Sequence, residues 1–180
     1  MSLLSKFANS IDALNRFVMY ALGIVVMTLV INVFAVAILR YGWDYGEIWM
    51  QELYVTLHSA IFMLGIAYTL SVDEHVRIDL IYRVLGKKAK AFINLVGSIF
   101  VALPIIYFLA KSSYPFVARS WQILERSAEA GGLPALYLVK SMLLVLSLLL
   151  GLQILAVICK SIVTLFSPQN SNITQENDHV

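Results

Sequence analysis

Few residues in this chain have the types and spacing needed for chemistry. Its one cysteine, Cys159, excludes an intramolecular disulfide, a Cys-x-x-Cys redox pair and a thiolate metal cluster. Of its three histidines, His58, His75 and His179, only His58 lies within a long apolar run. A histidine at such a place could act as a proton relay or a haem ligand. A bis-histidine haem needs a second buried histidine, however, and His75 lies in a charged connection, so the simpler interpretation of His58 is a hydrogen bond between helices.

Uncharged polar side chains are scattered through the same apolar runs. In a bilayer a hydrogen bond between helices contributes about 0.6 kcal/mol on average, and this is the role we expect for these side chains. They are Asn32, Thr56, Ser59, Asn94, Ser98 and Gln153. No Gly-rich phosphate loop, metal-ligand spacing or nucleophile arrangement accompanies them. The sequence therefore predicts neither an enzyme nor a bound cofactor or metal.

The apolar runs themselves determine the fold class. Apolar residues make up 60% of the 180 positions and charged residues 13%, whereas soluble domains average about 45–50% and about 25%. Four windows of 19 to 23 residues contain no Asp, Glu, Lys or Arg, and about 20 helical residues cross a bilayer. We predict an all-α integral membrane protein with four transmembrane helices, at about 17–39, 53–72, 91–110 and 138–160. A net charge of +2 is too small to indicate a nucleic-acid partner.

The distribution of Lys and Arg predicts the orientation. The N-terminal segment, the second connection and the C-terminal tail together carry 8 basic residues, and the first and third connections carry 5. Short cytoplasmic connections are the more basic ones. We therefore predict that both termini are cytoplasmic and that the chain is a multi-pass protein of the bacterial inner membrane.

Two amphipathic segments flank the predicted spans. Residues 2–15 have apolar side chains at spacings of three and four, which is typical of a helix lying in the membrane interface, although a plain extension of the first helix fits equally well. Residues 74–88 predict a second interfacial helix, whose basic side chains would meet anionic phospholipid headgroups. We expect one four-helix domain over 1–168 and a disordered tail over 169–180.

The two connections on the predicted outer side differ in character. The first is rich in tyrosine and tryptophan, which collect at the headgroup level of a membrane. The second, 111–140, is longer, and its residues 116–129 predict a short outer helix or a continuation of the third helix. Pro104 predicts a kink earlier in that third helix. The mixed charges of the second connection make it the expected contact for a protein partner outside the membrane.

Two stretches of sequence carry a family resemblance. The first is Arg40-Tyr41 followed by Trp49-Met50-Gln51-Glu52-Leu53, and the second is Gly65-Ile66-Ala67-Tyr68-Thr69-Leu70 leading to His75-Val76-Arg77-Ile78-Asp79. In this order and spacing they resemble the small membrane subunit, the Q subunit, of tripartite ATP-independent periplasmic (TRAP) transporters. The resemblance covers about residues 10–165. The segment from Glu125 to Lys140, with Gly131-Gly132-Leu133-Pro134, resembles a longer-looped subgroup of that family.

This resemblance implies a non-catalytic subunit of a secondary active transport system. Its partners would be a large multi-helix M permease subunit, in which the substrate and sodium sites lie, and a periplasmic substrate-binding protein that delivers a carboxylate-bearing substrate. The small subunit would enlarge the static scaffold and help to dock the binding protein. Keto or hydroxy acids, sialic acid and C4-dicarboxylates all remain open as the substrate.

The resemblance also suggests roles for individual residues. We expect contacts with the scaffold or the large subunit from six residues, Arg40, Trp49, Glu52, His75, Arg77 and Asp79. Within this set, we expect Arg40 and Glu52 to pair with each other. We expect contact with the binding protein from Glu125, Arg126 and Glu129.

Two other functions remain as alternatives. A membrane-anchor subunit of a redox complex would bind haem or quinone near His58, and a self-sufficient small carrier would transport without a partner. A carrier needs ionisable groups inside the bilayer, and the four windows contain no Asp, Glu, Lys or Arg.

Overall fold

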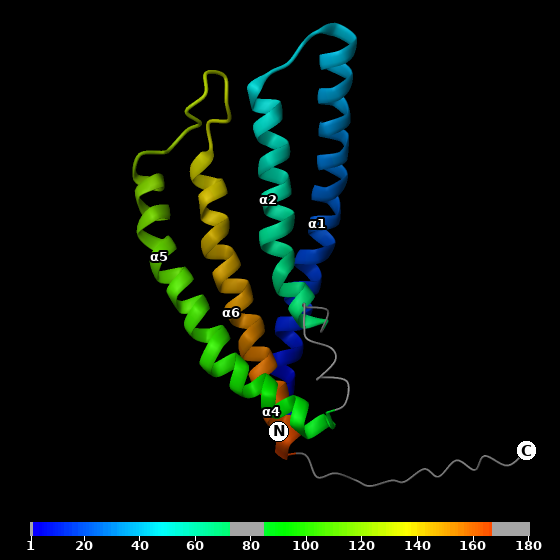
Figure 1. Ribbon diagram of the computed structural model, residues 1–180, viewed down its shortest axis with the longest axis vertical. Coiled ribbons are helices and arrows are strands. Elements are labelled where there is room, and N and C mark those ends of the chain that lie inside the picture. The colour runs from blue at the N-terminus through cyan, green and yellow to red at the C-terminus, as the bar shows by residue number, and fades with distance from the viewer. Residues whose placement is uncertain (1, 73–84, 167–180) are drawn as a thin grey trace, which may run out of the picture.

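The computed structural model describes residues 2–72 and 85–166, and every regular element in these ranges is helical (Figure 1). The elements are α1 (Ser2–Trp43), α2 (Ile48–Ser71), α4 (Lys87–Gly97), the π-helical turn η1 (Ser98–Ala102), α5 (Leu103–Gln122) and α6 (Leu136–Phe166). Since α4, η1 and α5 run on without a break, these ranges contain four helical stretches long and apolar enough to cross a membrane. The predicted all-α membrane fold is confirmed.

Helix α1 is longer than the predicted first span. It has 42 residues, which at 1.5 Å per residue is about 63 Å, or twice the hydrocarbon thickness of a bilayer. Residues 2–15 therefore do not form a separate helix: they are the plain extension of the first helix. The reason is that Ala8 and Ile11, at 0% and 5% exposure, pack against Ala156 of α6 and hold this segment in line with the rest of α1.

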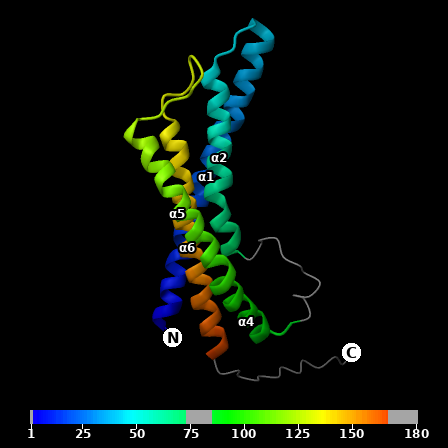
Figure 2. The same cartoon turned by 60° about the vertical axis from the view of Figure 1, so that its left-hand side comes forward.

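The third stretch is also longer than the predicted 91–110, because α5 continues to Gln122. Residues 116–122 thus continue the third helix and do not form a separate outer one. The π-helical turn lies directly before Pro104, whose ring would clash with the carbonyl four residues earlier in a regular α-helix. The helix bends in this region, as Pro104 predicts (Figures 1 and 2).

Helix α6 is the centre of the bundle. It packs against α1, α2, α4 and α5, and 28% of its most apolar window is buried, compared with 6–11% in the other three stretches. Its small and polar residues Ser147, Gln153, Ala156 and Ser161 are buried, which allows the neighbouring helices to approach closely. Along α1 and α5 many large apolar side chains face outward, whereas most of those in α2 are at least half-buried.

The described bundle has two distinct ends. The loop end carries the connections 44–47 and 123–135, and the terminal end carries Ser2, Ser71, Lys87 and Phe166 (Figure 1). The N-terminus and the last residue of α6 thus lie at the same end. The predicted interfacial segment 74–88 falls mostly, and the tail 169–180 entirely, outside the described residues. Lys87 and Lys88 are described, and they begin α4.

Candidate functional site

The carboxylate of Glu52 holds the long connection at the loop end. Glu52 lies in the second turn of α2, and one of its oxygens accepts a hydrogen bond from the Ser127 hydroxyl. The other oxygen accepts a hydrogen bond from the backbone N–H of Leu133 at 2.6 Å. The backbone of the connection also closes on itself, since Ser127 N donates to Leu133 O at 3.0 Å. One side chain of α2 thereby fixes two points of a loop about 80 residues further along the chain.

Gly132 makes this close approach possible. A Cβ atom at position 132 would lie 2.5 Å from the Ser127 Cβ and 2.8 Å from a Glu52 carboxylate oxygen, well inside normal contact distances. The preceding Gly131 has φ +83°, a conformation that side-chain-bearing residues rarely adopt. The pair Gly131-Gly132 is therefore required for two different reasons, one conformational and one steric.

A second ion pair ties the start of the connection to α6. The Lys140 ammonium lies 2.5 Å from a Glu125 carboxylate oxygen and 4.2 Å from the centre of the Phe116 ring. The hydrogen bond from Lys140 holds the pKa of the Glu125 carboxyl below its usual range. We call Glu52, Glu125, Ser127, Leu133 and Lys140 the loop-end clasp. It joins α2, the connection 123–135 and α6.

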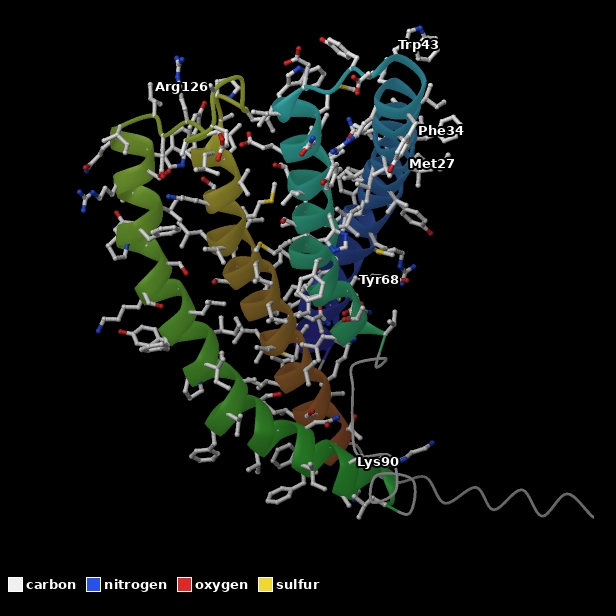
Figure 3. All side chains as sticks on the ribbon, turned by 45° about the horizontal axis from the view of Figure 1, so that its top comes forward. Met27, Phe34, Trp43, Tyr68, Lys90 and Arg126 are labelled. Atoms are coloured by element: carbon white, nitrogen blue, oxygen red, sulfur yellow. The ribbon has the colours of Figure 1, made fainter. Side chains whose placement is uncertain are left out.

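The three residues of this chain that were predicted to contact the binding protein differ in their surroundings. Glu125 belongs to the clasp and is committed to Lys140. Arg126 and Glu129 are exposed, and Figure 3 shows Arg126 at the loop end pointing away from the bundle. Of these three residues, Arg126 and Glu129 are the ones whose side chains are exposed for contact with a partner.

The prediction that Arg40 and Glu52 form an ion pair is wrong: the described structure does not contain this pair. Both Glu52 oxygens are used by Ser127 and Leu133, and Arg40 is exposed in the last turn of α1. A cation in the last turn of a helix is favoured by the helix dipole without any partner. Trp49 is 42% exposed at the start of α2. His75, Arg77 and Asp79 lie outside the described residues.

A buried polar network at the terminal end was missed by sequence reasoning, apart from Gln153. The Asn15 amide donates to the Gln153 carbonyl at 2.6 Å, and the Gln153 amide donates to Asp12 at 3.0 Å. The other Asp12 oxygen pairs with Lys160 at 2.5 Å. Asn15 and Gln153 are 1% and 0% exposed. We call these four residues the terminal-end network, and it joins α1 to α6.

A sequence signal for this network did exist. Asp12 and Asn15 are three residues apart, and Gln153 and Lys160 are seven apart, so each pair lies on one face of its helix. An interfacial helix over residues 2–15, one of the two alternatives that the sequence leaves open, would have Asp12 opposite its apolar face and away from α6. The face of α1 with Asp12 and Asn15 meets the face of α6 with Gln153 and Lys160 because the two helices pack together, and the sequence does not show this packing.

His58 has none of the surroundings of a cofactor or metal ligand. Its side chain is exposed, and it makes no hydrogen bond within the described ranges. Over 2–72 and 85–166, no group of three or more His, Cys, Asp or Glu side chains is arranged to hold a metal ion. Cys159 is a free, partly buried thiol.

In chemical terms, the charged groups of these two sites hold segments of the chain together. The clasp fixes a loop and the network fixes two helices, and each uses its carboxylates as hydrogen-bond acceptors. Such an arrangement provides a rigid frame with a few exposed charges at one end.

Comparisons with known proteins give the family. Residues 29–164 match the family described as tripartite ATP-independent periplasmic transporters, DctQ component. No curated protein and no solved structure matches the chain. The match covers more than half of the chain and includes the clasp, so this multi-pass inner-membrane protein belongs to the DctQ family, the small permease component of tripartite ATP-independent periplasmic transporters.

Proposed function

We propose that this chain is the static permease subunit that braces the large subunit of its transporter and helps to dock the periplasmic binding protein. The observation that carries the proposal is the loop-end clasp, which holds the connection 123–135 in one conformation and leaves Arg126 and Glu129 exposed on it. A preordered loop loses little conformational freedom when a partner binds. Charges on such a loop can also steer the approach of that partner.

The transport chemistry itself belongs, on this proposal, to the large subunit. Sodium coupling requires carboxylate or carbonyl oxygens that are free to surround the ion. The acidic residues of the two sites are already used as acceptors: Glu52 by the loop, Glu125 by Lys140, and Asp12 by Gln153 and Lys160. We expect the substrate to carry a carboxylate, as the family resemblance implies, and to be driven inward by sodium symport.

Charge reversal on the connection tests the docking role. Arg126→Glu combined with Glu129→Lys should lower binding-protein-dependent uptake several-fold, because both exposed charges would then oppose those of a complementary partner. Uptake should be measured in vesicles containing both permease subunits and increasing amounts of binding protein. The loss should be largest at low binding-protein concentration.

The matched control lies in the other connection of the loop end. Asp44 is exposed in residues 44–47, and its φ of 51° is well tolerated by asparagine, so Asp44→Asn removes a charge without straining the backbone. This variant should transport like the wild type. Equal uptake by the wild type and the double reversal, with equal amounts of assembled complex, would refute the docking role.

The redox-anchor alternative is not favoured. The family match is to a transporter component, and such components are generally non-catalytic. His58, on which that alternative depended, faces away from the other helices of the bundle.

A further inference from the structure

The position of His58 within α2 is unusual for a membrane helix. It is residue 11 of the 24 in α2, so it lies about 15 Å from the start of a helix about 36 Å long. Histidines at this depth almost always face the interior of a bundle or a water-filled cavity. His58 instead is exposed on the outside of the described bundle, without a hydrogen-bond partner there.

The surface around His58 is a continuous stripe along α2. Val55 and Phe62 are 55% and 69% exposed, and together with His58 they follow the spacings of three and four that place residues on one helix face. The same stripe continues to Ile48, which is 37% exposed. Acyl chains could cover the three apolar members, but they offer no hydrogen bond to an imidazole.

A groove opens beside this stripe towards the loop end. It has a volume of about 530 Å³, and its walls include Ile48, Gln51 and Val55 of α2 and Leu136 and Val139 of α6. The groove thus shares Ile48 and Val55 with the stripe. Glu52 of α2 and Glu129 of the connection also line the groove, near the loop end. The part lined by Val55, Leu136 and Val139 is apolar and suits the side chains of a further transmembrane helix.

A second polar group lies at the same depth. Asn32 is 11 residues before the end of α1, and His58 is 10 residues after the start of α2, in two helices joined by the short connection 44–47. The Asn32 side-chain carbonyl oxygen is buried and accepts no hydrogen bond from the part of the chain that the structure describes. The middle of the α1–α2 pair therefore contains two polar side chains whose hydrogen bonding is incomplete within residues 2–72 and 85–166.

We propose that the face of α2 formed by Ile48, Val55, His58 and Phe62 packs against a transmembrane helix of the large permease subunit, which presents a hydrogen-bonding side chain to His58. The proposal rests on the function proposed above, because that function supplies a second polytopic chain in the same membrane. It adds which face meets that chain and which polar group fixes the depth of the contact. A polar pair at one depth sets the register of two otherwise apolar helices.

Photo-crosslinking tests the position of the contact. A benzoylphenylalanine at position 55, in membranes that contain both permease subunits, should give an adduct with the combined mass of this chain and the large subunit. Position 101 is the matched control: Val101 is also a valine, is 57% exposed, and lies in η1, a turn that packs on α4, α5 and α6. It should give no such adduct.

Substitution of His58 tests the polar contact. His58→Leu should reduce the amount of large subunit retained during purification in mild detergent about threefold, the value of one average hydrogen bond between membrane helices. His58→Gln keeps a donor and an acceptor and should restore most of the retention. The control is Thr28→Val, because Thr28 is an exposed polar residue of α1 whose hydroxyl already donates to its own helix at Ile24 O.

The outcomes separate this inference from the proposed function. If the wild type retains the large subunit but position 55 gives no adduct, or gives one of twice the mass of this chain, the α2 face is not the contact. Wild-type retention by His58→Leu would likewise remove the role of the imidazole. If the wild-type chain retains no large subunit and supports no uptake, the proposed function itself fails.

Discussion

The loop-end clasp and the terminal-end network both use carboxylates to join distant parts of the chain, but they do so in different surroundings. In the clasp, partly exposed side chains bind a loop, and one of the donors is the backbone N–H of Leu133. In the network, Asn15 and Gln153 are fully buried and bind each other between two helices. Buried polar groups are costly to leave unpaired, whereas exposed ones can turn to water. The network should therefore control the stability of the bundle, and the clasp the shape of one loop.

Breaking the network should have the largest effect on stability. Gln153→Leu removes the partner of the buried Asn15 amide and one donor to Asp12, so we expect the free energy of unfolding to fall by about 2 kcal/mol. Titration of the purified protein from mild detergent into a denaturing one would measure it. Glu52→Gln, in the clasp, should change the same quantity much less.

The double variant Asn15→Leu/Gln153→Leu is the sharper test of this comparison. Replacing both buried partners by apolar groups of similar size leaves no amide unpaired, so most of the lost stability should return. The double variant could instead lose as much free energy of unfolding as the two single variants together. The loss would then come from altered packing and not from unpaired amides, and the proposed difference between the network and the clasp would be wrong.

Closing the clasp depends on Gly132, and its substitution should have an intermediate effect. Gly132→Ala forces a Cβ against Ser127 and Glu52, a strain of about 1–3 kcal/mol that the loop relieves by leaving Glu52. We expect binding-protein-dependent uptake to fall several-fold while assembly with the large subunit is unchanged. Gly46→Ala is the control, since nothing lies within 4 Å of a Cβ at position 46. A loss of assembly in Gly132→Ala would mean that the clasp supports the whole bundle.

Acid should open the clasp at Glu125, and we expect this effect to be smaller than those of the network substitutions and of Gly132→Ala. The hydrogen bond from Lys140 lowers the pKa of Glu125 in the folded protein, so its stabilisation is complete above the ordinary value of 4.5 and is lost as the pH falls through the lowered one. Limited proteolysis of the connection 123–135 should therefore accelerate only below that ordinary value. The Glu125→Gln variant should be cut rapidly at all pH values. If its proteolysis still accelerated in acid, a group other than Glu125 would cause the acceleration.

Sequence reasoning predicted the four helical stretches but not where each helix ends. The charge-free windows located all four helical stretches, because a lipid-embedded helix must be apolar over about 20 residues. The helices run on past those windows, back to Ser2 in α1 and on to Gln122 in α5. Helix continuation in these segments depends on contacts with other helices, and a hydropathy window contains no information about them.

Individual polar residues were harder to place than helices. Gln153 was correctly expected to bond between helices, since a buried amide needs a partner. The partner of Glu52 was wrongly expected to be Arg40, which is its neighbour across a short connection. The actual partners, Ser127 and Leu133, lie about 80 residues away, and proximity along the chain could not reveal them.

The sequence by itself determined that this protein resides in a lipid bilayer. In lipid, long apolar runs without charge can satisfy their backbone hydrogen bonds only as helices or closed barrels. Because these runs lack the alternation of apolar and polar residues that barrel strands have, they must form helices. Its motifs also indicated the family that the match over 29–164 established. The tertiary structure decided which polar groups are used internally and which remain available. Because α6 packs centrally, it takes Lys140, Gln153 and Lys160 into contacts within the chain and leaves Arg126, Glu129 and His58 facing outward.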